Sequence, residues 1–158
     1  MLAAYGAGSM LVALLLPKLL DRWPDRPFML AGATAQPVGL VAAAVLTALP
    51  AGAAAWAGFL ILWFLLGAAT SLILTPSARL LRRSSEETNR PAVFAAQFSL
   101  SHACFIITYP TAGTLGALLG LPITAVILAG IGLLAAIAAR LAWTNRVARS
   151  DLASSARN

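Results

Sequence analysis

The longest polar interruption in this chain of apolar runs is Arg79-Leu80-Leu81-Arg82-Arg83-Ser84-Ser85-Glu86-Glu87-Thr88-Asn89-Arg90. Four of its residues are arginines, and long apolar runs lie on both sides of it. Because Lys and Arg resist translocation across a bilayer, this composition predicts a cytoplasmic loop between two membrane-spanning helices. The side on which this loop lies then sets the direction of every other run.

The overall composition is typical of a membrane protein. Hydrophobic residues make up 60% of the chain and charged residues only 10%, and the mean hydropathy is +0.86. A soluble domain carries roughly 25% charged residues, so this chain has too few polar side chains to cover a surface that faces water. The expected solvent, and the first expected partner, is therefore the lipid bilayer.

Five apolar runs approach or exceed the about 20 residues that a helix needs to cross the hydrocarbon core. The second run contains Pro37, which is expected to kink it, and the third is expected to end at Pro76. The sequence therefore predicts an all-α fold, a polytopic membrane helix bundle with five transmembrane helices. Residues 1–145 form this bundle, and 146–158 are expected to be a disordered cytoplasmic tail. The predicted spans are 2–20, 28–49, 55–75, 92–118 and 123–143.

The distribution of basic residues predicts the topology. The eleven Lys and Arg residues fall in three segments of the chain. They are Lys18, Arg22 and Arg26, then Arg79, Arg82, Arg83 and Arg90, then Arg140, Arg146, Arg149 and Arg157. The other two turns, Pro50-Ala51-Gly52 and Gly120-Leu121-Pro122, carry none. This asymmetry predicts a multi-pass protein of the cell inner membrane with its N-terminus outside and its C-terminus in the cytoplasm.

Several classes of function are disfavoured by the sequence. The net charge of +6 is explained by topology and does not indicate a nucleic-acid partner. The single Cys104 makes no internal disulfide, and no cluster has metal-ligand spacing. His102 and Cys104 point about 200° apart around a helix, which does not suit a nucleophile and its base. The sequence therefore predicts no cofactor, no metal and no enzymatic activity.

The fourth predicted span contains a stripe of polar residues. They follow one another at steps of four, three, four and three, which places them on one face of a helix. Hydrocarbon cannot satisfy their hydrogen-bonding groups, so this face is expected to meet protein or water. Hydrogen bonding between helices is one interpretation, and lining of a substrate pathway is the other. The polar stripe consists of Gln97, Ser101, Cys104, Thr108 and Thr111, of which all but the cysteine are candidates for substrate contact.

His102 and the pair Tyr109-Pro110 lie in the same span. His102 is the only His, Asp, Glu, Lys or Arg placed well inside a predicted span, and imidazole changes protonation state near neutral pH. It is therefore a candidate for proton coupling, with a hydrogen bond to a neighbouring helix as the alternative. Tyr109 and Pro110 are candidates for a hinge, or else bend the helix to fit a neighbour.

The first predicted span contains the run Tyr5-Gly6-Ala7-Gly8-Ser9, which has few bulky side chains. Small residues let two helix backbones approach closely in a membrane, where lipid gives apolar helices no hydrophobic reason to associate. We expect this run to pack closely against another helix, with contact to a substrate as the second interpretation.

The loop after the first span resembles a motif of the major facilitator superfamily. That motif is Gly-x-x-x-Asp-Arg-x-Gly-Arg-Arg/Lys, and here Asp21, Arg22 and Arg26 occupy three of its positions. Pro17 and Pro24 replace the two glycines, and an aspartate, Asp25, replaces the first of the final basic pair. The loop is thus a degenerate copy of the motif.

The layout of the whole chain, about 2–143, resembles the last five helices of a twelve-helix transporter of that family. The resemblance implies that the spans are helices eight to twelve, that the chain is a fragment of a permease, and that it transports a small solute together with its missing N-terminal half. A hypothesis from a different class is a non-transporting five-helix protein that packs against another membrane helix bundle.

Overall fold

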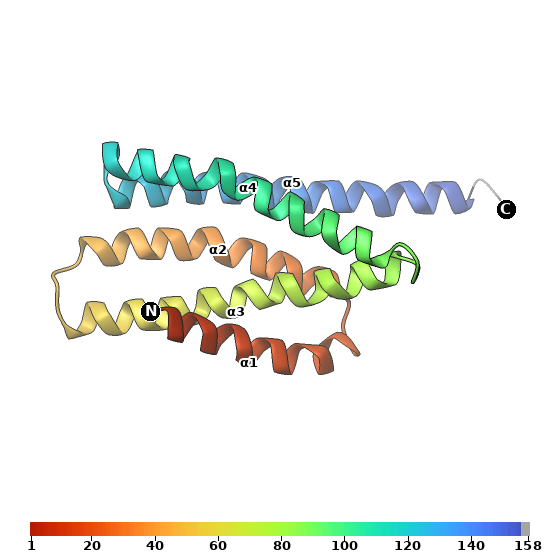
Figure 1. Cartoon of the computed structure of the whole chain (residues 1–158), viewed down its shortest axis with the longest axis horizontal. Coiled ribbons are helices and arrows are strands. Elements are labelled where there is room, and N and C mark those ends of the chain that lie inside the picture. Colours follow the sequence, from red (N-terminus) through yellow and green to blue (C-terminus); the bar gives the residue numbers. More distant parts are fainter. Residues whose placement is uncertain (156–158) are drawn as a thin grey trace.

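The computed structural model describes the backbone of residues 1–155 and the side chains of residues 1–143. In this part of the chain it contains five helices and no strand, and all five are long and apolar enough to cross a membrane. The helices are α1 (Leu2–Leu20), α2 (Asp25–Ala48), α3 (Ala53–Ser84), α4 (Arg90–Leu119) and α5 (Leu121–Ser155) (Figure 1). The predicted all-α membrane bundle with five transmembrane helices is confirmed.

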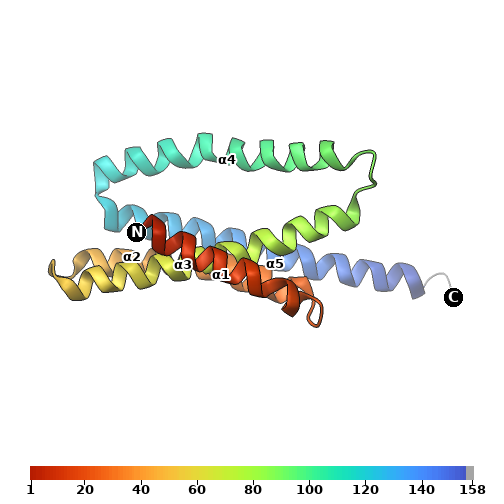
Figure 2. The same ribbon diagram turned by 60° about the horizontal axis from the view of Figure 1, so that its bottom comes forward.

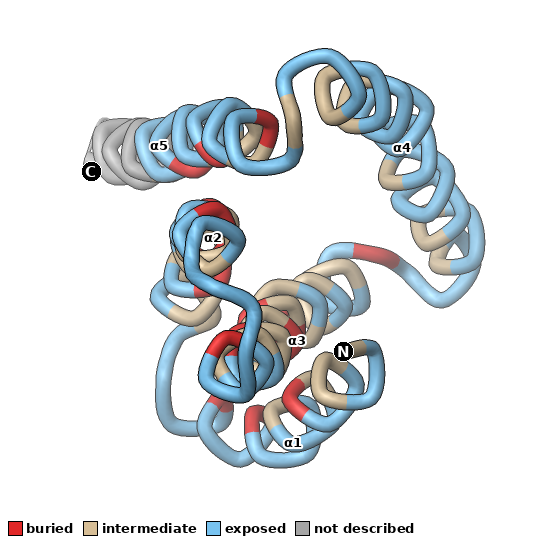
Figure 3. Tube along the Cα trace, turned by 90° about the vertical axis from the view of Figure 1, so that its left-hand side faces the viewer, coloured by how far each residue is buried: buried red, intermediate tan, exposed pale blue. Residues whose placement is uncertain are grey.

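The helices follow one another in space in an order different from that of the sequence. α3 packs between α1 and α2, and α2 packs on its other side against α5. Among the described residues, α4 packs along α5 and near the end of α3, and it stands apart from the layer formed by α1, α2 and α3 (Figure 2). Viewed along the helices, the order α1, α3, α2, α5, α4 describes an open arc (Figure 3).

α1 and α3 approach so closely that only glycine fits at two positions. A Cβ atom added to Gly8 would overlap the backbone carbonyl of Phe64, and one added to Gly67 would overlap the backbone carbonyl of Tyr5. Both glycines are buried. The prediction that the small-residue run of the first helix packs closely against another helix is therefore confirmed.

The third helix does not end at Pro76, and that prediction is wrong. α3 continues through this proline to Ser84, and Pro76 is fully buried. The hydroxyl of Ser77 donates to the carbonyl oxygen of Ile73 at 2.6 Å, so a side-chain donor bonds the backbone beside the site where proline lacks its N–H. Most of the polar segment 79–90 is therefore helical, while the limits of the membrane-embedded spans remain predictions.

α5 is described as a helix as far as Ser155, within the segment 146–158. The disordered cytoplasmic tail that the sequence predicts for this segment stays a prediction. This segment contains Ala, Leu and Arg residues, which have a high intrinsic helix propensity. Residues 156–158 lie outside the part of the chain that the structure describes.

Candidate functional site

The polar stripe lies on a helix that the rest of the chain leaves uncovered. α4 contains no buried residue. Gln97, Cys104 and Thr108 are exposed, and Ser101 and Thr111 are half-buried. The three hydroxyls donate to carbonyl oxygens of α4 itself, at distances between 2.6 and 3.0 Å. The described structure therefore brings these residues together on one face but shows no hydrogen bond from them to another helix.

A row of aromatic rings accompanies the polar stripe along α4. The His102 ring stacks on Phe98 with centroids 3.8 Å apart and meets the edge of Phe105 at 5.4 Å. Phe105 in turn stacks on Tyr109 at 5.0 Å. Each of these four residues immediately follows a member of the polar stripe, so this aromatic row lies about 100° around the helix from it. Sequence reasoning placed only His102 and Tyr109 on this face, although the spacing of the phenylalanines already indicated it.

His102 is held in a defined orientation by the aromatic row. Its Nδ1 atom lies 2.8 Å from the carbonyl oxygen of Phe98. Because a carbonyl oxygen only accepts, Nδ1 is the donor in this contact, and in the neutral ring Nε2 is then the basic nitrogen. The side chain is exposed and reaches no neighbouring helix in the described part of the chain. The geometry leaves one imidazole nitrogen free to accept a hydrogen bond from outside the helix.

The polar contacts between helices occur in α1, α2 and α3 instead. The Thr70 hydroxyl lies 2.7 Å from the Tyr5 hydroxyl and accepts a hydrogen bond of 2.7 Å from the Gln36 side-chain amide. Thr70 itself donates to the carbonyl oxygen of Leu66 at 3.0 Å. One hydroxyl on α3 thus joins three helices. Sequence reasoning missed this cluster, although a glutamine within a long apolar run was a visible signal.

A second pair of hydroxyls joins α1 to α3. Ser9 and Ser71 lie 2.8 Å apart through their Oγ atoms, and Ser71 also donates to the carbonyl oxygen of Ser9 at 2.8 Å. Ser71 is almost completely buried. These bonds are paired and shielded, so we interpret them as packing contacts.

The loop-motif residues lie at the arginine-rich end of the bundle. Asp21 forms an ion pair of 3.6 Å with Arg79 of α3, and Asp25 forms one of 3.7 Å with Arg83. The Arg26 guanidinium lies 5.9 Å from the ring centroid of Trp143 on α5, and Arg22 is exposed. The loop after α1 and the first residue of α2 are therefore attached to the end of α3 through Asp21 and Asp25.

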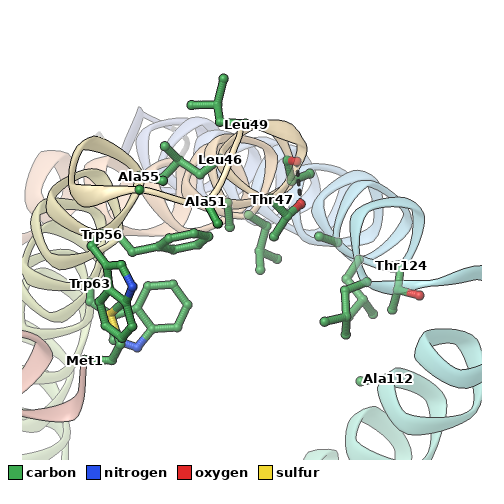
Figure 4. Close-up of a pocket in the computed structure, with 18 residues that line it drawn as sticks. Met1, Leu46, Thr47, Leu49, Ala51, Ala55, Trp56, Trp63, Ala112 and Thr124 are labelled. Atoms are coloured by element: carbon green, nitrogen blue, oxygen red, sulfur yellow. Dashed lines mark hydrogen bonds between the residues drawn. The ribbon is translucent and has the colours of Figure 1, made fainter.

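A cavity lies at the opposite end, between α2, α3, α5 and α4 (Figure 4). Its volume is about 720 Å³, and its walls are mostly aliphatic and aromatic, with Trp56, Phe59 and Trp63 on one side. The Thr47 hydroxyl donates to the carbonyl oxygen of Ala44 in its own helix, and the Thr124 hydroxyl donates to that of Gly120, just before α5. This cavity can take an apolar group but offers little to hold a polar solute.

The fold and the helix lengths define a multi-pass integral membrane protein. The sequence model of the Major Facilitator Superfamily matches residues 1–157, so the chain belongs to that family of membrane transporters. The predicted resemblance to this family is confirmed. No curated protein and no solved structure gives a match to the chain.

Proposed function

We propose that the chain is the C-terminal portion of a twelve-helix permease of the inner membrane, in which α1–α5 are helices eight to twelve. It transports a small solute together with an N-terminal half. Its N-terminus lies outside and its C-terminus in the cytoplasm. The family match supports the transporter class, and the resemblance of the layout supports the position within the transporter.

The observation that carries this proposal is the environment of α4. None of its 30 residues is buried, although it contains the polar stripe and His102. The side-chain amide of Gln97 and the Nε2 atom of His102 have no hydrogen-bond partner among the described residues. Hydrocarbon offers none, so these groups need further protein or water. A transporter half that faces a second half across a solute pathway supplies both.

The proposal assigns roles to the individual residues of α4. Gln97, Ser101, Thr108 and Thr111 contact the solute or the water around it. His102, with Nδ1 engaged and Nε2 exposed, accepts and releases the coupling proton. The pair Tyr109-Pro110 lies in the continuous helix α4, where Pro110 removes one backbone hydrogen bond and permits bending when the two halves move.

Uptake by the complete permease tests these roles. A panel of radiolabelled small solutes is first screened for uptake into proteoliposomes that contain the permease. Uptake of the solute identified in this screen is then measured for each variant. We expect Gln97→Ala to lower uptake about tenfold, because one hydrogen bond to the solute is lost. We expect a similar loss in His102→Ala, because the group that carries the coupling proton is removed. Ser99→Ala serves as the control because Ser99 lies about 200° around the helix from Gln97.

Equal uptake by all three variants at equal expression would contradict the role of the polar stripe. The mass of the native gene product tests the fragment assignment separately. A product of 16.3 kDa that copurifies with an unrelated membrane subunit and shows no flux would favour the non-transporting five-helix protein instead.

A further inference from the structure

We propose that the arginine-rich end of the bundle contains a binding site for the phosphate group of an anionic ligand. The site is a hollow of about 590 Å³ between the end of α1, the end of α3 and the start of α4. We call it the arginine pocket. Its lining residues are Pro17, Leu20, Asp21, Thr75, Ala78, Arg79, Arg82, Arg83 and Arg90. This site is separate from α4's polar stripe and does not depend on the proposed transport role.

The arginine pocket has more positive charge than its own carboxylates compensate. Arg79 is paired with Asp21 and Arg83 with Asp25. Arg82 and Arg90 form no ion pair with any described residue, and the nearby Glu86 and Glu87 are exposed. Two of the four guanidinium groups are therefore available to an anion from outside the chain.

Arg90 gives an independent indication of a missing partner. Arg90 as a whole is partly exposed, but its Nε atom is buried and has no hydrogen-bond partner in the described structure. A buried charged donor without an acceptor is costly, and native proteins almost always supply one. Arginines that only keep a loop in the cytoplasm need not be buried, and they need not come together from different helices. The unsatisfied Nε atom therefore favours a bound acceptor in the pocket.

The chemistry and depth of the pocket favour phosphate. Guanidinium groups are planar forks of donors that match two oxygens of a phosphate at once. Arg79, Arg82 and Arg83 follow the predicted end of the third span at Thr75 by four to eight residues, which places them about 6–12 Å beyond the hydrocarbon. Lipid headgroups occupy this depth, and basic pockets between helices on the cytoplasmic side bind anionic headgroups.

Native mass spectrometry of the protein purified from its membrane tests the site. Phosphatidylglycerol, phosphatidylcholine and inorganic phosphate are added separately and in competition. We expect phosphatidylglycerol to bind at least about tenfold more tightly than phosphatidylcholine, and the double variant Arg82→Gln, Arg90→Gln to lose about tenfold of this affinity. The double variant Lys18→Gln, Arg22→Gln is the control, because it removes two charges at the same end of the bundle but outside the pocket.

The outcomes separate the sources of the phosphate. Displacement of phosphatidylglycerol by millimolar inorganic phosphate identifies a free phosphate as a competent ligand, and failure to displace it identifies the lipid headgroup. Equal loss of affinity in both double variants, or equal binding of the two lipids, would overturn the proposal. If the glutamine variant does not fold, Arg82→Lys with Arg90→Lys replaces it. A several-fold loss in that variant supports the guanidinium site, and unchanged affinity contradicts it.

Discussion

α3 and α4 are helices of similar length, 32 and 30 residues, in opposite environments. In the apolar 18-residue stretch of α3, 22% of the residues are buried. In the corresponding stretch of α4, no residue is buried. α3 is packed between α1 and α2, while α4 leaves most of its surface uncovered. The surface of α3 is thus largely covered by other helices of this chain, and the surface of α4 is not.

The polar side chains of the two helices show the same difference. Thr70 and Ser71 of α3 bond to α1 and α2, whereas the threonine hydroxyls of α4 bond to the backbone of their own helix. In a membrane, a polar group must find a partner within protein or water. The comparison teaches that burial, and not polarity alone, separates a packing residue from a candidate pathway residue.

The largest expected effect comes from the closest contact of α3. Gly67→Ala places a Cβ atom against the backbone carbonyl of Tyr5, which cannot move as a flexible side chain can. We expect the free energy of unfolding, measured by denaturant titration in detergent, to fall by about 3 kcal/mol. In α4, Gly113 has no atom within 4 Å of such a Cβ, so Gly113→Ala should change it by less than about 1 kcal/mol, in the stabilising direction. Equal destabilisation by both variants would break the comparison.

A smaller effect is expected from the hydroxyl that joins three helices. Thr70→Val keeps the shape of the side chain but removes the acceptor used by Gln36 and the partner of Tyr5. Polar contacts between membrane helices contribute about 1 kcal/mol, so we expect a loss of that size in the same titration. Thr114→Val is the matched control in α4, because its hydroxyl bonds only to carbonyls of its own helix. A loss in Thr114→Val as large as in Thr70→Val would show that these contacts between helices are not stabilising.

The smallest effect is expected at the arginine-rich end of α3. The ion pair of Asp21 with Arg79 spans 3.6 Å, and the Asp21 side chain is 74% exposed. Exposed pairs contribute about 0–1 kcal/mol and are screened by salt. We expect Asp21→Asn to lower the melting temperature slightly at low ionic strength and to have no effect at about 0.5 M salt. A large fall in the melting temperature of Asp21→Asn that persists at high salt would contradict this prediction and place the ion pair among the main packing contacts of α3.

The sequence predicted the features that depend on length, period and composition. Five long apolar runs gave five helices, and the steps between Gln97 and Thr111 correctly placed the polar stripe on one face. The small residues around Gly8 gave the close helix contact. The role of the stripe in transport stays a prediction.

Features that depend on which helices are neighbours were not predictable in this way. Tyr5 and Thr70 are separated by 65 positions, and no local pattern states that they touch. Pro76 lies fully buried within α3, and no local pattern in the sequence states that this proline is covered by other helices. The unpartnered Nε atom of Arg90 became visible only when the end of α3 was placed beside the start of α4.

Labelling of Cys104 tests the central claim, that the polar stripe of α4 faces water between two transporter halves. Cys104 is exposed and belongs to the stripe. A thiol reacts as the thiolate, which forms readily in water and not in hydrocarbon. Native membranes are treated with a charged, membrane-impermeant methanethiosulfonate and, separately, with an apolar maleimide, and the Cys104→Ser variant gives the background.

The control cysteine is introduced by Ile106→Cys in the Cys104→Ser background. Ile106 is 77% exposed and lies about 200° around α4 from Cys104, on the opposite face. The account predicts that the charged reagent labels Cys104 and leaves the Ile106→Cys variant unlabelled. Labelling of Cys104 by the apolar maleimide alone, or equal labelling of both positions by the charged reagent, would contradict it.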